Sequence, residues 1–107
     1  MIDTVRIDAL TYKVSETKEP IIIDNRETRG KIEYNSAEIV ISDREETCSN
    51  DRKAAVLMHE IVHGIIYERG LMSQVDDSEM LCDEFSSAFI GLIRDNPKLI
   101  DFIKGGR

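Results

Sequence analysis

The sequence predicts an α+β domain in which a small N-terminal antiparallel sheet precedes the helices. Runs rich in β-branched residues fill residues 4–42, whereas apolar residues recur at helical spacing from about residue 50 onward. Strand and helix patterns do not alternate, so the helices should be segregated from the sheet. The length of 107 residues suffices for one hydrophobic core, and we predict a single domain over residues 1–107.

Short strands are predicted for the first half of the chain. Residues 4–14, TVRIDALTYKV, alternate only partly and predict one strand, and residues 20–24, PIIID, form a short apolar run bounded by turn residues. Residues 30–42, GKIEYNSAEIVIS, predict a hairpin with Asn35 and Ser36 at its turn. Such a strand pair needs a helix or a further sheet against one face to be stable.

Residues 49–70 predict the first helix, which begins at a candidate N-cap among residues 49–51 and ends at Gly70. Five residues at helical spacing should face the core: Ala54, Met58, Ile61, Val62 and Ile65.

A second helix is predicted from residues 76–78 to about Asp95, because Pro97 pushes the preceding residue out of the α region. Its apolar stripe should also face the core, and consists of Leu81, Phe85, Ala88, Phe89 and Leu92. A last short helix over residues 97–104 should stop at Gly105 and Gly106.

Charge and cysteine usage limit the classes of partner. The net charge of −7 would repel a phosphate backbone, and no basic stripe is present, so we predict no nucleic-acid partner. No apolar run approaches the roughly 20 residues needed to cross a bilayer, so we predict no membrane partner either. The N-terminal segment is acidic, unlike a signal peptide, and Cys48 and Cys82 form no CxxC pair. We therefore predict a cytoplasmic protein with reduced thiols.

Both histidines of the chain lie in LMHEIVHG, residues 57–64, within the first predicted helix. His59 and His63 are four residues apart and so share one helix face, where two imidazole nitrogens can reach one metal ion at about 2.0–2.1 Å. Glu60 lies about 100° further around the helix and can stand beside a water on the metal without binding the metal itself. HExxH on a helix is typical of zinc hydrolases, so we predict a Zn²⁺ site rather than two polar residues on an ordinary helix.

Gly64 follows this motif at a position where glycine costs about 1 kcal/mol of helix stability relative to alanine. Either an open cleft above the metal or close packing of the helix against a neighbour would explain it, and the sequence leaves both explanations open.

The third ligand must be a carboxylate or a thiolate, because a catalytic zinc site usually has three protein ligands and the chain has no third histidine. Glu79, Asp83 and Ser86 share one face of the second predicted helix. We predict that Glu79 binds the metal and that Asp83 accepts a hydrogen bond from a histidine ring N–H. Asp83 and Glu84 remain alternatives as the ligand. Cys82 is expected to be a buried free thiol rather than a ligand.

Glu79 also has a structural explanation without metal. It could complete a capping box with Asp76 as the N-cap, and acidic residues are favoured in a first helical turn in any case.

HEIVH followed by EMLCD, residues 79–83, resembles the gluzincin arrangement of HExxH and then ExxxD. Over residues 28–95 the chain is most similar to the ImmA/IrrE-type metallopeptidases, and to small phage or mobile-element members in particular. This resemblance implies a minimal zincin-like domain, in which the Glu is the third zinc ligand and the Asp orients a histidine. It also implies that the substrate is a repressor-like regulator.

The sequence departs from that family pattern in two places. CDEFSSAF matches the family's acidic-Ala-Asn-x-Phe-Ala segment only loosely, and no His or Tyr follows Glu79 to stabilise an oxyanion. Tyr67, Tyr34 and Arg94 are the candidates for that role.

Two functions follow from these residues. The first is a zinc-dependent peptidase in which His59, His63 and Glu79 hold the metal and Glu60 is the general base. An extended segment of a protein substrate would then add to the edge of the hairpin at residues 31–42. The alternative is a zinc-stabilised interaction module without turnover, in which four protein ligands would fill the site. A zinc hydrolase acting on a non-peptide substrate is a third option.

Overall fold

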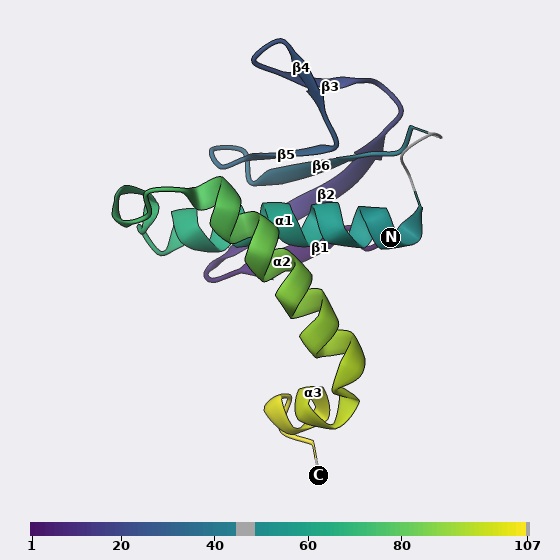
Figure 1. Cartoon of the computed structure of the whole chain (residues 1–107), viewed down its shortest axis with the longest axis vertical. Helices are drawn as coiled ribbons and strands as arrows, with labels where there is room; N and C mark the ends of the chain where they lie inside the picture. Colours follow the sequence, from purple (N-terminus) through teal and green to yellow (C-terminus); the bar gives the residue numbers. More distant parts are fainter. Residues whose placement is uncertain (45–48, 107) are drawn as a thin grey trace.

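The computed structural model describes residues 1–44 and 49–106, in which strands come first and helices follow (Figure 1). The strands are β1 (Thr4–Ile7), β2 (Leu10–Thr17), β3 (Ile21–Ile23), β4 (Arg26–Thr28), β5 (Gly30–Glu33) and β6 (Glu38–Ser42). The helices are α1 (Asn50–Glu68), a 3₁₀ turn η2 (Met72–Gln74), α2 (Ser78–Asp95) and α3 (Pro97–Ile103). This order confirms the predicted α+β class. Cys48 lies outside the described residues.

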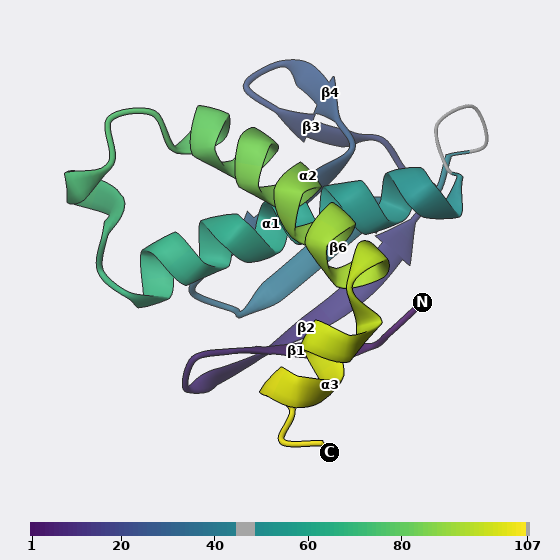
Figure 2. The same ribbon diagram turned by 60° about the horizontal axis from the view of Figure 1, so that its bottom comes forward.

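Four strands form the main sheet in the order β1-β2-β6-β5. The sheet is mixed and not purely antiparallel as predicted, because β6 returns beside β2 in the parallel direction. β3 and β4 form a separate antiparallel pair that projects beyond β5 (Figures 1 and 2). β5 is therefore an edge strand of the main sheet, with β6 on one side only.

The prediction of one strand over residues 4–14 is wrong, because a tight turn divides this segment into the β1–β2 hairpin. Asp8 adopts the left-handed conformation there, with φ 53°. Asp tolerates this conformation better than most residues, yet Asp-Ala lacks the glycine that usually signals a two-residue turn.

The apolar run at residues 20–24 is confirmed as a strand, but its pairing with β4 was not predicted. Asp24 and Asn25 connect the two strands with φ values of 52° and 64°. Two consecutive positive φ values are what a tight hairpin turn of the I′ type requires. The predicted hairpin at residues 30–42 is confirmed as β5 and β6, with Gly30 opposite Ile41.

α1 has the predicted limits. The Ser49 hydroxyl accepts a hydrogen bond from the Arg52 N–H at 3.1 Å, which caps the first turn. Gly70, at φ 68°, ends the helix in the left-handed conformation, and the Leu71 N–H donates to the Ile66 carbonyl at 2.9 Å.

α1 lies against one face of the sheet, and their shared core contains the buried side chains of Ile7, Tyr12, Val14, Ile39 and Ile41. Each apolar side chain buried in this way contributes about 1.5–3 kcal/mol. The helix contributes the half-buried Val56, Leu57, Ile61 and Ile65. Of the helix residues predicted to face the core, Ile61 and Ile65 pack here, Val62 is buried against α2, and Ala54 and Met58 are half-buried.

Gly64 is buried in this helix–sheet contact, which decides between its two explanations. A Cβ at this position would lie 2.7 Å from Ile7 Cδ1 and 3.2 Å from Ile32 Cδ1. Close packing of α1 on the sheet therefore accounts for the glycine, and an open cleft does not.

The predicted core-facing stripe of α2 is wrong. Phe85, Ala88, Phe89 and Leu92 are exposed and Leu81 is half-buried, whereas the buried residues of the helix are Cys82 and Ser86. Cys82 packs against Val62 and Ile66 of α1. α2 thus turns its more polar face toward α1, where its acidic residues Glu79 and Asp83 contact the two histidines.

α3 has the predicted position, and Gly105 follows it at φ 88°. The second half of α2 and α3 extend away from the sheet (Figure 1). No helix among the described residues is long and apolar enough to cross a membrane.

Candidate metal centre

Three side chains from two helices converge at the crossing of α1 and α2. His63 Nε2 lies 2.7 Å from Glu79 Oε1, and His59 Nε2 lies 3.3 Å from Glu79 Oε2. One ligand atom from each residue lies within 4.8 Å of the other two. His59, His63 and Glu79 could therefore hold a metal ion.

The geometry and the chemistry of this group fit such an ion. Two imidazole nitrogens and one carboxylate oxygen form a donor set that zinc accepts. Donor atoms at 2.0–2.1 Å from a tetrahedral ion are about 3.3 Å apart, close to the two contacts with Glu79. An ion would thus require only small movements of the three side chains.

Asp83 lies on the other side of the His59 ring. Its Oδ1 is 3.0 Å from His59 Nδ1, a distance at which Nδ1–H donates a hydrogen bond to the carboxylate. With the ring proton held at Nδ1, the lone pair at Nε2 points toward Glu79 and the metal position. The structure therefore brings Asp83 to the place where a carboxylate would orient His59.

Glu79 takes no part in the capping box that would have explained it without metal. The N-cap of α2 is Asp77, whose Oδ1 accepts a hydrogen bond from the Met80 N–H at 3.0 Å. Glu79 instead directs both carboxylate oxygens toward the histidines. Of the alternative ligands, Asp83 contacts the opposite ring nitrogen, and Glu84 lines the neighbouring cleft outside the metal-ligating group.

Cys82 is also outside that group of ligands. It is a free thiol, fully buried, and burial raises its pKa to about 12, with further raising by Glu79 and Glu60. Its position outside the group of His59, His63 and Glu79 agrees with the prediction of a buried free thiol rather than a ligand.

Glu60 lies on the same helix as the histidines but is not part of the group that could bind metal. Its side chain is buried, with 7% of its surface exposed. Burial raises the pKa of Glu60 to about 7; the neighbouring Glu79 also raises it, and His59 lowers it. A carboxylate with a pKa near neutrality can both accept and return a proton.

A cleft of about 1100 Å³ opens beside these residues. Its walls are formed by α1, by α2 and by the segment from β3 to β5, so the edge strand and the metal-ligating group share one cavity. Gly30 of β5 makes this approach possible, because a Cβ there would lie 2.6 Å from Val56 Cγ1 and 3.4 Å from Glu60 Oε2. Nothing in the local sequence indicates this role, since Gly30 has the position of an ordinary strand boundary.

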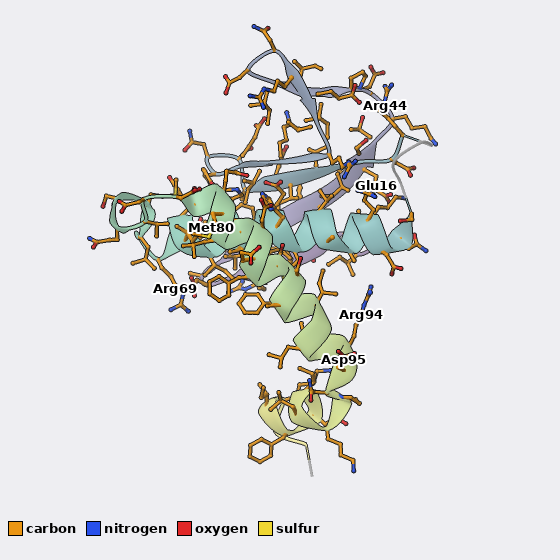
Figure 3. The ribbon with its side chains drawn as sticks, in the orientation of Figure 1. Glu16, Arg44, Arg69, Met80, Arg94 and Asp95 are labelled. Atoms are coloured by element: carbon orange, nitrogen blue, oxygen red, sulfur yellow. The ribbon has the colours of Figure 1, made fainter. Side chains whose placement is uncertain are left out.

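Among the three oxyanion candidates, only Tyr34 lines the cleft. Its ring stacks on that of Tyr67, with the centroids 4.0 Å apart and the planes at 4°. Burial raises the pKa of Tyr34, and the nearby Glu60, Cys82 and Glu79 raise it further, so the phenol keeps its proton. Arg94 instead pairs with Asp51 at 3.2 Å, on the projecting part of α2 (Figure 3).

Comparison of the chain with protein-family models, with curated proteins and with solved structures gives no match. The resemblance to ImmA/IrrE-type metallopeptidases therefore stays a prediction that depends on HEIVH and EMLCD.

Proposed function

We propose that the chain is a zinc-dependent metallopeptidase that cleaves a peptide bond in an extended segment of a protein. The observation that carries this proposal is the convergence of His59, His63 and Glu79 beside the buried Glu60, in a cleft bordered by an edge strand. Zinc held by these ligands would supply Lewis acidity, which acidifies water and polarises a carbonyl group.

The residues around the metal position have complementary roles in this mechanism. Glu60, buried beside the possible metal ligands, accepts the proton of the attacking water and returns it to the leaving amine. Asp83 keeps His59 in the tautomer that binds metal through Nε2. Tyr34 donates its hydroxyl proton in a hydrogen bond to the oxygen that gains negative charge.

β5 supplies a site for the substrate backbone. The Ser42 N–H donates to the Arg29 carbonyl at 2.8 Å, so Arg29 belongs to the positions of this strand that bond to β6. Such positions alternate along an antiparallel strand, so the backbone groups of Gly30 and Ile32 point to the open side of β5. The Thr28 hydroxyl donates to the Gly30 carbonyl at 3.1 Å. The N–H and carbonyl of Ile32 are thus the pair that an incoming strand would use, and Ile32 lines the cleft.

The walls of the cleft also indicate which substrates are favoured. Arg26 and Arg52 line it and form no ion pair with the described part of the chain. We expect acidic side chains beside the cleaved bond to bind there. A repressor-like regulator of a phage or mobile element is the substrate that the sequence resemblance favours, and a cytoplasmic location accords with it.

Two substitutions test the proposal. Glu60→Gln should abolish hydrolysis while one zinc per chain remains bound, because the amide cannot accept the proton. Glu79→Ala should lower the zinc content measured by atomic absorption, while Glu84→Ala, a change to a carboxylate in the same cleft, should not. Retained hydrolysis in Glu60→Gln would exclude this mechanism. A zinc-loaded wild type that cleaves no peptide or protein would favour the interaction module without turnover.

A further inference from the structure

Seven large apolar side chains are exposed on the two projecting helices, and together they are here called the arm face. On α2 they follow at spacings of four, three and one residues, which keeps them on one side of the helix. On α3 they recur three and four residues apart. The arm face consists of Phe85, Phe89, Leu92 and Ile93 on α2, and of Leu99, Phe102 and Ile103 on α3, each between 36% and 77% exposed.

The metal-ligating group prevents α2 from burying this surface against its own chain. The opposite side of the helix is fixed to α1 by Cys82 and by the contacts of Glu79 and Asp83 with the histidines. Turning the phenyl rings inward would remove both carboxylates from His59 and His63. α3 has no buried residue and adds to the exposed surface.

The size of the arm face is that of a protein interface. Seven side chains of on the order of 200 Å² each, exposed to the stated fractions, leave roughly 700 Å² of apolar surface in water. The largest apolar patch on a typical monomer is about 300–600 Å². A stable interface buries about 800 Å² on each partner, which the arm face with its polar rim would supply.

The distribution of charge indicates which partner fits. Residues 85–104 carry Arg94, Lys98 and Lys104 against Asp95 and Asp101, a net charge of +1, while the whole chain has −7. The remaining residues therefore carry −8, so two copies of this chain repel each other except at the arm. Arg94 already pairs with Asp51 of its own chain. The other charged residues of the arm alternate in sign, so an antiparallel copy can place opposite charges in register: Asp95, Lys98, Asp101 and Lys104.

We propose that the arm face is the interface of a symmetric homodimer, in which the α2–α3 segments of two copies pack against each other. Figure 3 shows Arg94 and Asp95 near the end of α2, on the part of the helix that extends away from the sheet. This inference does not depend on the peptidase proposal, because the contacts that orient α2 require neither bound zinc nor catalysis.

Sedimentation equilibrium of the full chain tests the dimer. The wild type should have twice the chain mass of 12.2 kDa. Leu92→Asp and Phe102→Asp should each weaken the dimer at least tenfold, because an unpaired carboxylate in an apolar interface costs more than the ~1.4 kcal/mol that a factor of ten represents. Ile22→Asp is the matched control: Ile22 is an apolar residue 58% exposed on β3, outside the arm.

Each outcome decides the proposal. Far-UV circular dichroism and urea unfolding check that the two arm variants are folded, which we expect because both residues are exposed. A wild type that stays monomeric overturns the proposal, and binding of that monomer to phosphatidylcholine vesicles would assign the arm face to lipid. A dimer that survives both arm substitutions, or that Ile22→Asp dissociates equally, places the interface elsewhere and also overturns it.

Discussion

The hydrogen bond between Tyr12 and Glu68 joins the sheet to the helix that carries HEIVH, and its removal has a calculable cost. Tyr12 has no exposed surface, and its hydroxyl donates to Glu68 Oε2 at 2.7 Å. Tyr12→Phe deletes the hydroxyl and keeps the ring in the core. A hydrogen bond to a charged group is worth about 1.5–3 kcal/mol, so we expect the free energy of unfolding to fall by about 2 kcal/mol. For a domain of this size that corresponds to a decrease in Tm of about 10 °C.

Urea unfolding followed by circular dichroism at 222 nm measures this change, because the chain is rich in helix and has no tryptophan. A double-mutant cycle with Glu68→Ala isolates the pair, and its coupling energy should exceed about 1 kcal/mol. Tyr67→Phe is the control, since Tyr67 is 41% exposed on the same helix. A coupling energy near zero would show that the ring alone, and not the hydrogen bond, joins β2 to α1.

The contact between Tyr12 and Glu68 should also make the free energy of unfolding depend on pH above pH 10. Burial raises the pKa of Tyr12, and the hydrogen bond and charge of Glu68 raise it further. Above pH 10 the tyrosine therefore ionises in the unfolded chain first, and the stability that the raised pKa provides at lower pH is progressively lost. One pH unit beyond the unfolded pKa removes about 1.4 kcal/mol. The advantage of wild type over Tyr12→Phe should thus shrink by about that amount between pH 8 and pH 11, and a constant advantage would refute this reasoning.

Two further substitutions examine the groups around the metal position. Asp83→Ala should weaken zinc affinity by about 10–100-fold, measured in competition with a chelating dye, because His59 loses the acceptor at Nδ1. The control Glu84→Ala should leave the affinity unchanged. Equal zinc affinities in the two variants would show that Asp83 does not orient His59. Tyr34→Phe should lower kcat for the cleaved substrate by about 10²–10³ with zinc content unchanged, because one oxyanion donor is lost. Tyr67→Phe keeps the stacked ring and should retain kcat, so an equal loss in both variants would indicate that the stack, and not the Tyr34 hydroxyl, matters.

The local sequence was sufficient wherever a single segment determines its own structure. Ser49 and Gly70 mark the two ends of α1, because a hydroxyl cap and a left-handed glycine each act within one helical turn. Glu79 and Asp83 could be placed on one helix face from their spacing alone. That they meet His59 and His63 on another helix depends on tertiary packing. It was anticipated from the lack of a third histidine, and also from the resemblance to the gluzincin arrangement.

The turns and the edge strand show where sequence reasoning failed. Asp8, Asp24 and Asn25 adopt positive φ without the glycine that marks most such turns, so two of the hairpins were not recognised. Gly30 was not recognised either, because its importance comes from the approach of Val56 and Glu60, which lie about 30 residues away in the chain.

The failed assignment of the apolar face of α2 has a physical cause that links the metal centre to the arm face. Assigning a helix face to the core from hydrophobicity assumes that apolar burial outweighs every other contact. Here α2 buries Cys82 and Ser86 instead. Phe85, Phe89 and Leu92 are left exposed to water. Such an orientation is favourable only where further interactions compensate for it, and the structure offers two: the convergence of carboxylates with histidines on one side of α2, and a surface of interface size on the other. α2 thus breaks the rule that a helix buries its apolar face. Natural chains depart from such rules mainly at functional sites, so we expect function at this helix.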